Sequence, residues 1–279
     1  MVASFVGVGA FAAGPAVAAE DSFDPLSIVE SQGLLQSPQG SVDQQSLKAA
    51  AGADLSDAET FVAPVDIVPV TDAPASASDN ATVYTADDHG FVTGVGTSGT
   101  NAGFIVLQDE TAPSTYSFEI GAADASLTLN DDGSVTVTDA AGNFVNYIET
   151  PWARDADGRD LPTSYSVEGN ILTQTVSTEG AAFPVVADPT TGCGPGWCSI
   201  YFNRNETKAI AAGGPTAATA IAAGCAAINF GFGGLCALGW GVAAAVAQGA
   251  YAAGNCLGWF YTPVGNNPFV EPRGTVHCP

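Results

Sequence analysis

All six cysteines of this 279-residue chain lie after residue 192. Over residues 193–279 they make up about 7% of the chain, close to the density of small secreted domains that disulfides hold together. Zinc is the poorer interpretation, because the chain has no pair of Cys-x2-Cys motifs and its only histidines are His89 and His277. We therefore expect a separate disulfide-stapled domain over residues 191–279. Its cysteines are Cys193, Cys198, Cys225, Cys236, Cys256 and Cys278.

Proximity along the chain favours one disulfide pairing. Joining Cys225 to Cys236, Cys256 to Cys278 and Cys193 to Cys198 closes three short loops, each with Gly or Pro inside. These residues let the backbone turn tightly enough for the close Cα approach that a disulfide requires. Other connectivities stay open at this point.

Charge divides the chain at the same place. Residues 1–192 carry 27 acidic and three basic residues, a net charge of −24, whereas residues 193–279 carry two acidic and three basic residues. The overall charge of −23 excludes nucleic acid, which binds clustered Lys and Arg, and opposes contact of the whole chain with an anionic membrane. Two units with different roles are expected.

The N-terminal segment is typical of export. Residues 1–19 are small and apolar and end in Ala18 and Ala19 before Glu20, a pattern that signal peptidase cleaves, although no Lys or Arg precedes the apolar run. A buried N-terminal helix is the alternative. Residues 20–80 are acidic and rich in Ser, Ala, Pro and Gln, a composition that predicts a mostly disordered spacer.

Residues 81–190 have the pattern of short β-strands. Thr115–Ile120 alternates apolar and polar residues, and two hairpins are indicated by Asp131-Asp132-Gly133 and Glu168-Gly169-Asn170, each between short alternating runs. Several short strands separated by turns predict an antiparallel β-sandwich-like domain.

Five distinctive phrases within this region, from DETAPSTY at 109–116 to PVVADP at 184–189, carry a resemblance. Residues 104–189 resemble a module of exported actinobacterial proteins, in which it precedes short, variable C-terminal domains. The Ala-rich, Cys-containing C-terminal region is also similar to small domains of such proteins. The resemblance implies export and a two-part architecture, and it implies no activity. The phrases are DETAPSTY (109–116), DGSV (132–135), PWARDADG (151–158), LPTSY (161–165) and PVVADP (184–189).

The C-terminal region predicts helices. Asn203 and Glu206 have the spacing of a capping box at the start of a helix. Two Ala-rich segments follow, at residues 215–227 and 235–253, with a Gly-rich turn between them. They predict an α-helical hairpin, which a Cys225–Cys236 bridge would close at its turn.

No charged residue occurs between Lys208 and Glu271. Such a run fits either close packing of small side chains in a water-soluble hairpin or a bacteriocin-like hairpin that enters membranes. The second interpretation predicts only weak binding, because Ala and Gly add little to insertion. Its membrane-contact candidates are Leu235, Leu238, Trp240, Val242 and Val246.

Candidates for chemistry are few. Asp155, Asp157 and Asp160 form a candidate calcium loop, but the closing Glu of an EF-hand is missing and a polar turn explains the same residues. His89 follows two aspartates and could be an oriented base, and His277 adjoins Cys278. Paired carboxylates of a glycosidase are expected by chance in so acidic a chain.

We therefore expect an α+β, multi-domain chain: a β-sandwich-like domain followed by a small disulfide-stapled α-helical hairpin domain, without catalytic residues or cofactors. The favoured function is that of a secreted, non-enzymatic antibacterial or cell-surface effector, whose partner is a membrane or another cell-surface component. An extracellular envelope-associated binding or adhesion protein is the first alternative, and a secreted hydrolase is the second.

Overall fold

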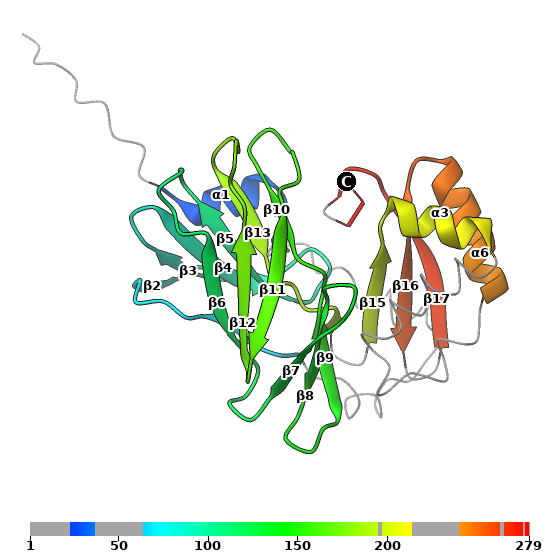
Figure 1. Cartoon of the computed structure of the whole chain (residues 1–279), viewed down its shortest axis with the longest axis horizontal. Coiled ribbons are helices and arrows are strands. Elements are labelled where there is room, and N and C mark those ends of the chain that lie inside the picture. Colours follow the sequence, from blue (N-terminus) through cyan, green and yellow to red (C-terminus); the bar gives the residue numbers. More distant parts are fainter. Residues whose placement is uncertain are drawn as a thin grey trace, which may run out of the picture.

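The computed structural model describes residues 23–36, 64–194, 197–213, 240–262, 265–275 and 277–278. Within these ranges the chain is mostly β, with four antiparallel sheets and three helices (Figure 1). The predicted signal peptide, the helix at 215–227 and the Cys225–Cys236 bridge lie outside the described residues.

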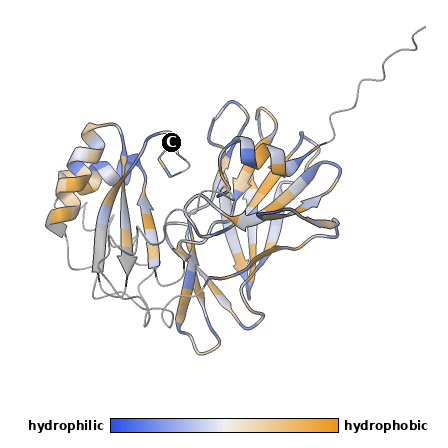
Figure 2. Ribbon diagram, turned by 180° about the vertical axis from the view of Figure 1, so that it is seen from behind, coloured by the Kyte–Doolittle hydropathy of each residue, from blue (hydrophilic) through white to orange (hydrophobic). Residues whose placement is uncertain are grey.

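Two of the sheets share one apolar core. The strand orders are β10-β13-β5-β4-β3-β2 and β1-β6-β12-β11. Residues of both sheets meet in a cluster that includes the fully buried Ile105, Phe118 and Leu172. Figure 2 shows apolar and hydrophilic residues interspersed along these strands, as expected where one face of a strand is buried. The strands are β1 (Ile67–Pro69), β2 (Ala75–Ala77), β3 (Ala81–Thr85), β4 (His89–Val95), β5 (Asn101–Leu107), β6 (Thr115–Ile120), β10 (Trp152–Arg154), β11 (Thr163–Glu168), β12 (Ile171–Val176) and β13 (Val185–Asp188).

Helix α1 (Pro25–Ser31) packs on the six-stranded sheet. Asp24 caps its N-terminus by accepting hydrogen bonds from the backbone N–H groups of Leu26 and Ser27. Val29 is fully buried in a second cluster, with residues of β3, β4 and β5. Parts of the acidic 20–80 segment therefore belong to the folded unit, since α1, β1 and β2 all lie within it.

In a three-stranded sheet, β7-β8-β9, strands β8 and β9 are largely buried and β7 is mostly exposed. Its strands are β7 (Ser126–Leu129), β8 (Val135–Thr138) and β9 (Phe144–Ile148), and β7 and β8 are joined at the predicted Asp131-Asp132-Gly133 turn. Ile148 belongs to the core of the first two sheets, whereas Phe144 and Tyr147 belong to the core of the C-terminal region. The strand β9 thus links the two halves of the molecule.

The C-terminal region forms a fourth sheet, β14-β15-β16-β17, with helices α3 and α6 beside it (Figure 1). Ile210 of α3 and Ala243 and Ala247 of α6 are fully buried in the C-terminal cluster with Leu257 of β16. The elements are β14 (Cys193–Gly194), β15 (Trp197–Phe202), α3 (Arg204–Ala212), α6 (Trp240–Ala252), β16 (Cys256–Thr262) and β17 (Gly265–Glu271).

The prediction of a β-sandwich-like domain followed by an α-helical hairpin domain is wrong. The chain is mostly β, its strands are divided among four small sheets, and the C-terminal region contributes one of them. Trp259, Phe260 and Tyr261 lie in strand β16, as expected of aromatic residues in a sheet. The strands at 126–148 form a sheet of their own, and β9 contributes residues to two different cores.

Candidate functional site

A cavity of about 260 Å³ lies where the two halves of the molecule meet. We call it the junction cavity. Its walls come from the β7–β8 turn, the chain between β9 and β10, the end of β15 with the start of α3, and the C-terminal loop around His277. In Figures 1 and 2 this loop, beside the letter C, lies between the two halves. The lining residues are Asp132, Ser134, Tyr147, Glu149, Thr150, Pro151, Trp152, Ile200, Tyr201, Phe202, Asn203, Glu206 and His277.

Glu149 and His277 meet in this cavity. The imidazole Nδ1 of His277 lies 3.3 Å from Oε2 of Glu149, and the two side chains are 14% and 12% exposed. Burial, followed by repulsion from Asp188 and Glu271, raises the pKa of Glu149 well above its usual value. Burial lowers the pKa of His277 to about 4. Both shifts favour the uncharged forms of the pair.

Tyr201 holds the other side of His277. The two rings are stacked, with centroids 3.6 Å apart and planes 12° from parallel. The next residue after His277, Cys278, is bonded to Cys256 at the start of β16. The disulfide and the stacked ring together fix the imidazole against Glu149.

Hydrogen bonds between the two halves of the molecule hold the walls of the cavity together. The side-chain amide of Asn146 donates to the carbonyl of Cys193 and accepts from its N–H, both at 3.1 Å, and Asn146 is fully buried. The hydroxyl of Tyr147 donates to the carbonyl of Ser199. Strand β9 is therefore fastened to β14 and β15 by buried hydrogen bonds, whose loss would leave unsatisfied groups.

A buried carboxyl lies next to the site. Asp188, 1% exposed, accepts a hydrogen bond from the Thr190 hydroxyl, and the Tyr165 hydroxyl donates to its backbone carbonyl. Burial raises the pKa of Asp188 to about 7, against smaller opposing effects of Thr190 and Trp152. Glu149 follows the apolar end of β9 and Asp188 ends β13, and the charge of Asp188 contributes to the raised pKa of Glu149.

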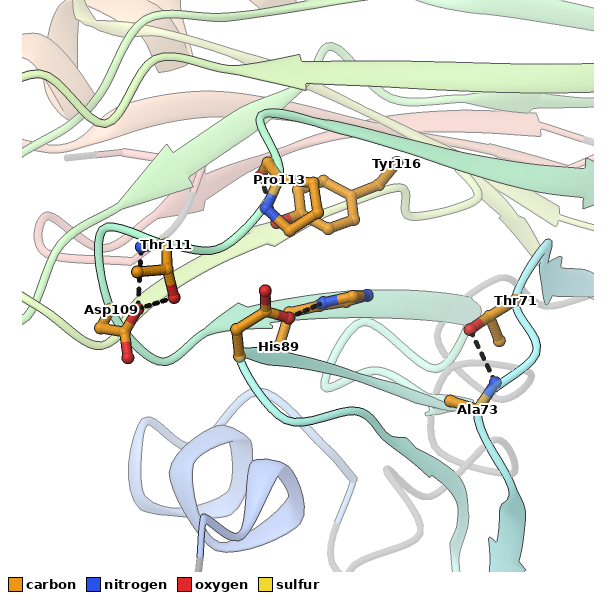
Figure 3. Close-up of polar contacts among 8 residues, drawn as sticks. Thr71, Ala73, His89, Asp109, Thr111, Pro113 and Tyr116 are labelled. Carbon is orange, nitrogen blue, oxygen red and sulfur yellow. Dashed lines mark hydrogen bonds and ion pairs between the residues drawn. The ribbon is translucent and has the colours of Figure 1, made fainter.

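Asp88 and His89 form a second, separate pair at the start of β4. The His89 imidazole Nδ1 lies 2.6 Å from Oδ1 of Asp88, and the ring lies beside Tyr116 (Figure 3). The Tyr116 hydroxyl is engaged with the carbonyl of Pro113. Burial, followed by the charge of Asp88, raises the pKa of Tyr116, so this phenol stays protonated. The structure thus orients His89 against Asp88, as its sequence context suggested. His89 is not among the residues that line the junction cavity.

The three candidate calcium ligands do not converge. Asp155 is 3% exposed, and its carboxylate accepts hydrogen bonds from backbone N–H groups of Asp157, Arg159 and Ala182. Asp160 instead pairs with Arg154 at 3.1 Å. Among the described residues no group of three or more His, Cys, Asp or Glu side chains is arranged to hold a metal ion.

The membrane-contact candidates fall partly within α6. Leu235 and Leu238 lie outside the described residues, as does the side chain of Trp240. Val242 is 58% exposed, whereas Val246 packs against the C-terminal cluster. Across the part of the chain that the structure describes, no helix is both long and apolar enough to cross a bilayer.

Two predicted disulfides are formed. Cys193 is bonded to Cys198, and Cys256 to Cys278. These bridges indicate an oxidising environment. The sequence did not single out Glu149, Asp188 or Tyr201, although an acid directly at the end of an apolar strand, as in Tyr147-Ile148-Glu149 and Val186-Ala187-Asp188, is a signal that could have found the two carboxyls.

Comparison with known protein families, with curated proteins and with solved structures finds no match to this chain. The junction cavity is therefore interpreted from its own residues.

Proposed function

We propose that this is an exported, non-enzymatic binding protein of the cell envelope or its surroundings, and that the junction cavity binds a neutral polyhydroxylated ligand such as a sugar ring. The observation that carries the proposal is the lining: the aromatic residues Trp152 and Tyr201 occur together with the polar residues Glu149, His277 and Ser134. At about 260 Å³ the cavity is close to the lower end of ligand pockets, which are roughly 300–1,000 Å³.

The charge of the lining selects among small ligands. Asp132 and Glu206 lie in the same cavity, whose described lining includes no Lys or Arg, so an anion is disfavoured. Glu149 and His277 both favour their uncharged forms, so the pair offers hydrogen bonds without a net charge that would call for a cation. A sugar supplies what remains: hydroxyl groups for these polar atoms and C–H faces for the aromatic rings.

Export rests on three observations that point the same way. The apolar segment at residues 1–19 has the pattern of a signal peptide. The Cys193–Cys198 and Cys256–Cys278 bridges require oxidising conditions. The resemblance of residues 104–189 to a module of exported actinobacterial proteins supports the same location.

Titration of the oxidised protein with cellobiose and with N,N′-diacetylchitobiose, followed by NMR, tests the proposal. Thr150 lines the cavity and is exposed, so Thr150→Trp fills the site without entering a core. Thr128→Trp is the matched control, because Thr128 is exposed in strand β7, none of whose residues lines the cavity.

We expect at least one disaccharide to shift resonances of Trp152 and His277, and Thr150→Trp to weaken that binding by at least about tenfold, or 1.4 kcal/mol. Thr128→Trp should bind as the native chain does. The absence of any shift with both sugars, or equal binding of a glucuronic acid disaccharide, would overturn the proposal.

A second candidate function is that of an antibacterial effector acting on membranes through the C-terminal region. It is favoured by one observation: Val242 is exposed on helix α6, which has no charged residue. The test is dye release from vesicles of neutral and of anionic lipid by the oxidised protein, with Val242→Asp as the variant. If the native protein releases no dye at micromolar concentration, this candidate fails.

A further inference from the structure

We infer that the ligand of this protein is an extended chain, because a second cavity shares Tyr201 and His277 with the junction cavity and can serve as a second binding subsite. This inference rests on the proposed function and specifies its ligand as an oligosaccharide of neutral units instead of a single ring.

The second subsite is a cavity of about 640 Å³ that adjoins the C-terminal loop. We call it the outer cavity. It is formed where the segment after α1, the β4–β5 turn, the loop after β10 and the loop after β17 converge. Its volume falls within the range of established ligand pockets, roughly 300–1,000 Å³. The residues that matter to the argument are Gln32, Thr97, Ser98, Arg154, Glu271 and Thr275.

Tyr201 and His277 line both cavities. Their stacked rings, with planes 12° from parallel, form a wall that the two cavities share. A linear ligand that lies along this wall would contact the junction cavity at one end and the outer cavity at the other. A ligand confined to one ring would leave the larger of the two cavities without a role.

The chemistry of the outer cavity matches that of the junction cavity. Thr97, Ser98 and Gln32 contribute hydroxyl and amide groups, which both donate and accept hydrogen bonds. Its basic residue, Arg154, is paired with Asp160 at 3.1 Å. Burial raises the pKa of Glu271, which disfavours its ionised form. Neither cavity therefore presents an unpaired positive charge to an anionic ligand, and both suit neutral hydroxylated units.

A ladder of N-acetylglucosamine oligomers, from one to four units, tests the inference by calorimetric titration. Thr97 is exposed and lines the outer cavity, so Thr97→Trp obstructs that subsite alone. Thr150→Trp obstructs the junction cavity, and Thr128→Trp serves again as the control. Each variant is first compared with the native chain by circular dichroism and thermal unfolding, so that a folding defect is recognised.

We expect the affinity of the native chain to rise by at least about tenfold between two and four units. Thr97→Trp should remove this gain and leave binding of the dimer unchanged, whereas Thr150→Trp should weaken every oligomer. Affinity that does not change with length, or a Thr97→Trp variant that keeps the full gain, would overturn the second subsite while leaving the proposed function in place. If neither these oligomers nor the matching cellobiose series binds, the proposed function fails and this inference fails with it.

Discussion

Asp188 and His277 are buried titratable groups whose pKa values are shifted in opposite senses. The pKa of Asp188 is raised to about 7 and that of His277 is lowered to about 4, in both cases chiefly by burial. Protons bound by the folded chain and not by the unfolded chain stabilise the fold at low pH, and the reverse holds for protons bound only when unfolded. Each residue therefore gives stability its own dependence on pH.

Asp188 makes the folded chain less stable as pH rises. Between about pH 4 and pH 7 the folded carboxyl keeps a proton that the unfolded chain has released, so its contribution to the free energy of unfolding falls as pH rises. We predict that Asp188→Asn flattens the fall over this window by a few kcal/mol. Urea unfolding at a series of pH values measures the difference. Asp124→Asn, at an exposed position, should leave the slope unchanged.

His277 acts in the opposite direction. The unfolded imidazole takes up a proton as pH falls through about 6.5, whereas the folded one does so only near 4, so stability is lost on acidification between these values. We predict that His277→Phe, which keeps a ring against Tyr201, removes this loss. An acid branch that is equally steep in the variant would contradict the assignment.

A substitution at Gly192 tests how closely the two halves of the molecule pack against each other. A Cβ built there would lie 1.9 Å from the Tyr147 ring. Because this contact belongs to a buried part of the junction, we predict that Gly192→Ala lowers the free energy of unfolding by about 1–3 kcal/mol. Gly249→Ala is the control of opposite sign: it meets no atom within 4 Å in helix α6 and should be neutral or stabilising by up to about 1 kcal/mol. Thermal unfolding of both variants decides.

At the scale of single elements the sequence was informative. Helix α3 begins after Asn203, with both halves of the predicted capping box in place. Strand β6 has the bounds that its alternation predicts, and the β7–β8 and β11–β12 hairpins turn at the predicted residues. Such features depend on residues only a few positions apart, so a local pattern contains all the information that they need.

The cap of α3 lies in the wall of the junction cavity, so its strength is relevant to the site. Asn203 accepts hydrogen bonds from the backbone N–H groups of Asn205 and Glu206, at 2.9 and 3.0 Å. We predict that Asn203→Ala lowers the free energy of unfolding by about 1 kcal/mol. Asn205→Ala, two residues later at an exposed position, should lower the free energy of unfolding much less. Equal losses in the two variants would show that the cap contributes nothing.

At the scale of the whole molecule the sequence was least informative. Glu149 and His277 lie far apart in the chain, and only the docking of the C-terminal region onto β9 brings them together. The three-stranded sheet misled the prediction because its strand β9 contributes residues to two different cores, a property that alternation along one strand does not reveal. Tertiary packing, and not local propensity, decided both the division into four sheets and the position of the site.

The two described bridges should differ in their effect on stability and on the site. Cys256–Cys278 spans 22 residues and Cys193–Cys198 spans five. Loop entropy predicts losses of about 3 and about 2 kcal/mol when each pair is replaced by Ser. Only the Cys256→Ser, Cys278→Ser variant should also release His277 from Tyr201, which NMR of the imidazole would detect. An unchanged imidazole signal in that variant would show that stacking alone holds the ring.

The position of the bridges also bears on the order of assembly. All six cysteines lie beyond residue 192, so no disulfide can tie the C-terminal sheet to the sheets that precede it. Thiol oxidation can run to completion in a molecule whose halves have never met. Counting free thiols would then certify a preparation as mature while the wall formed by Tyr201 and His277 still faced open solvent. Contacts such as Asn146 with Cys193 are formed only on docking, so a spectroscopic signal from the junction, and not the redox state, marks the finished protein.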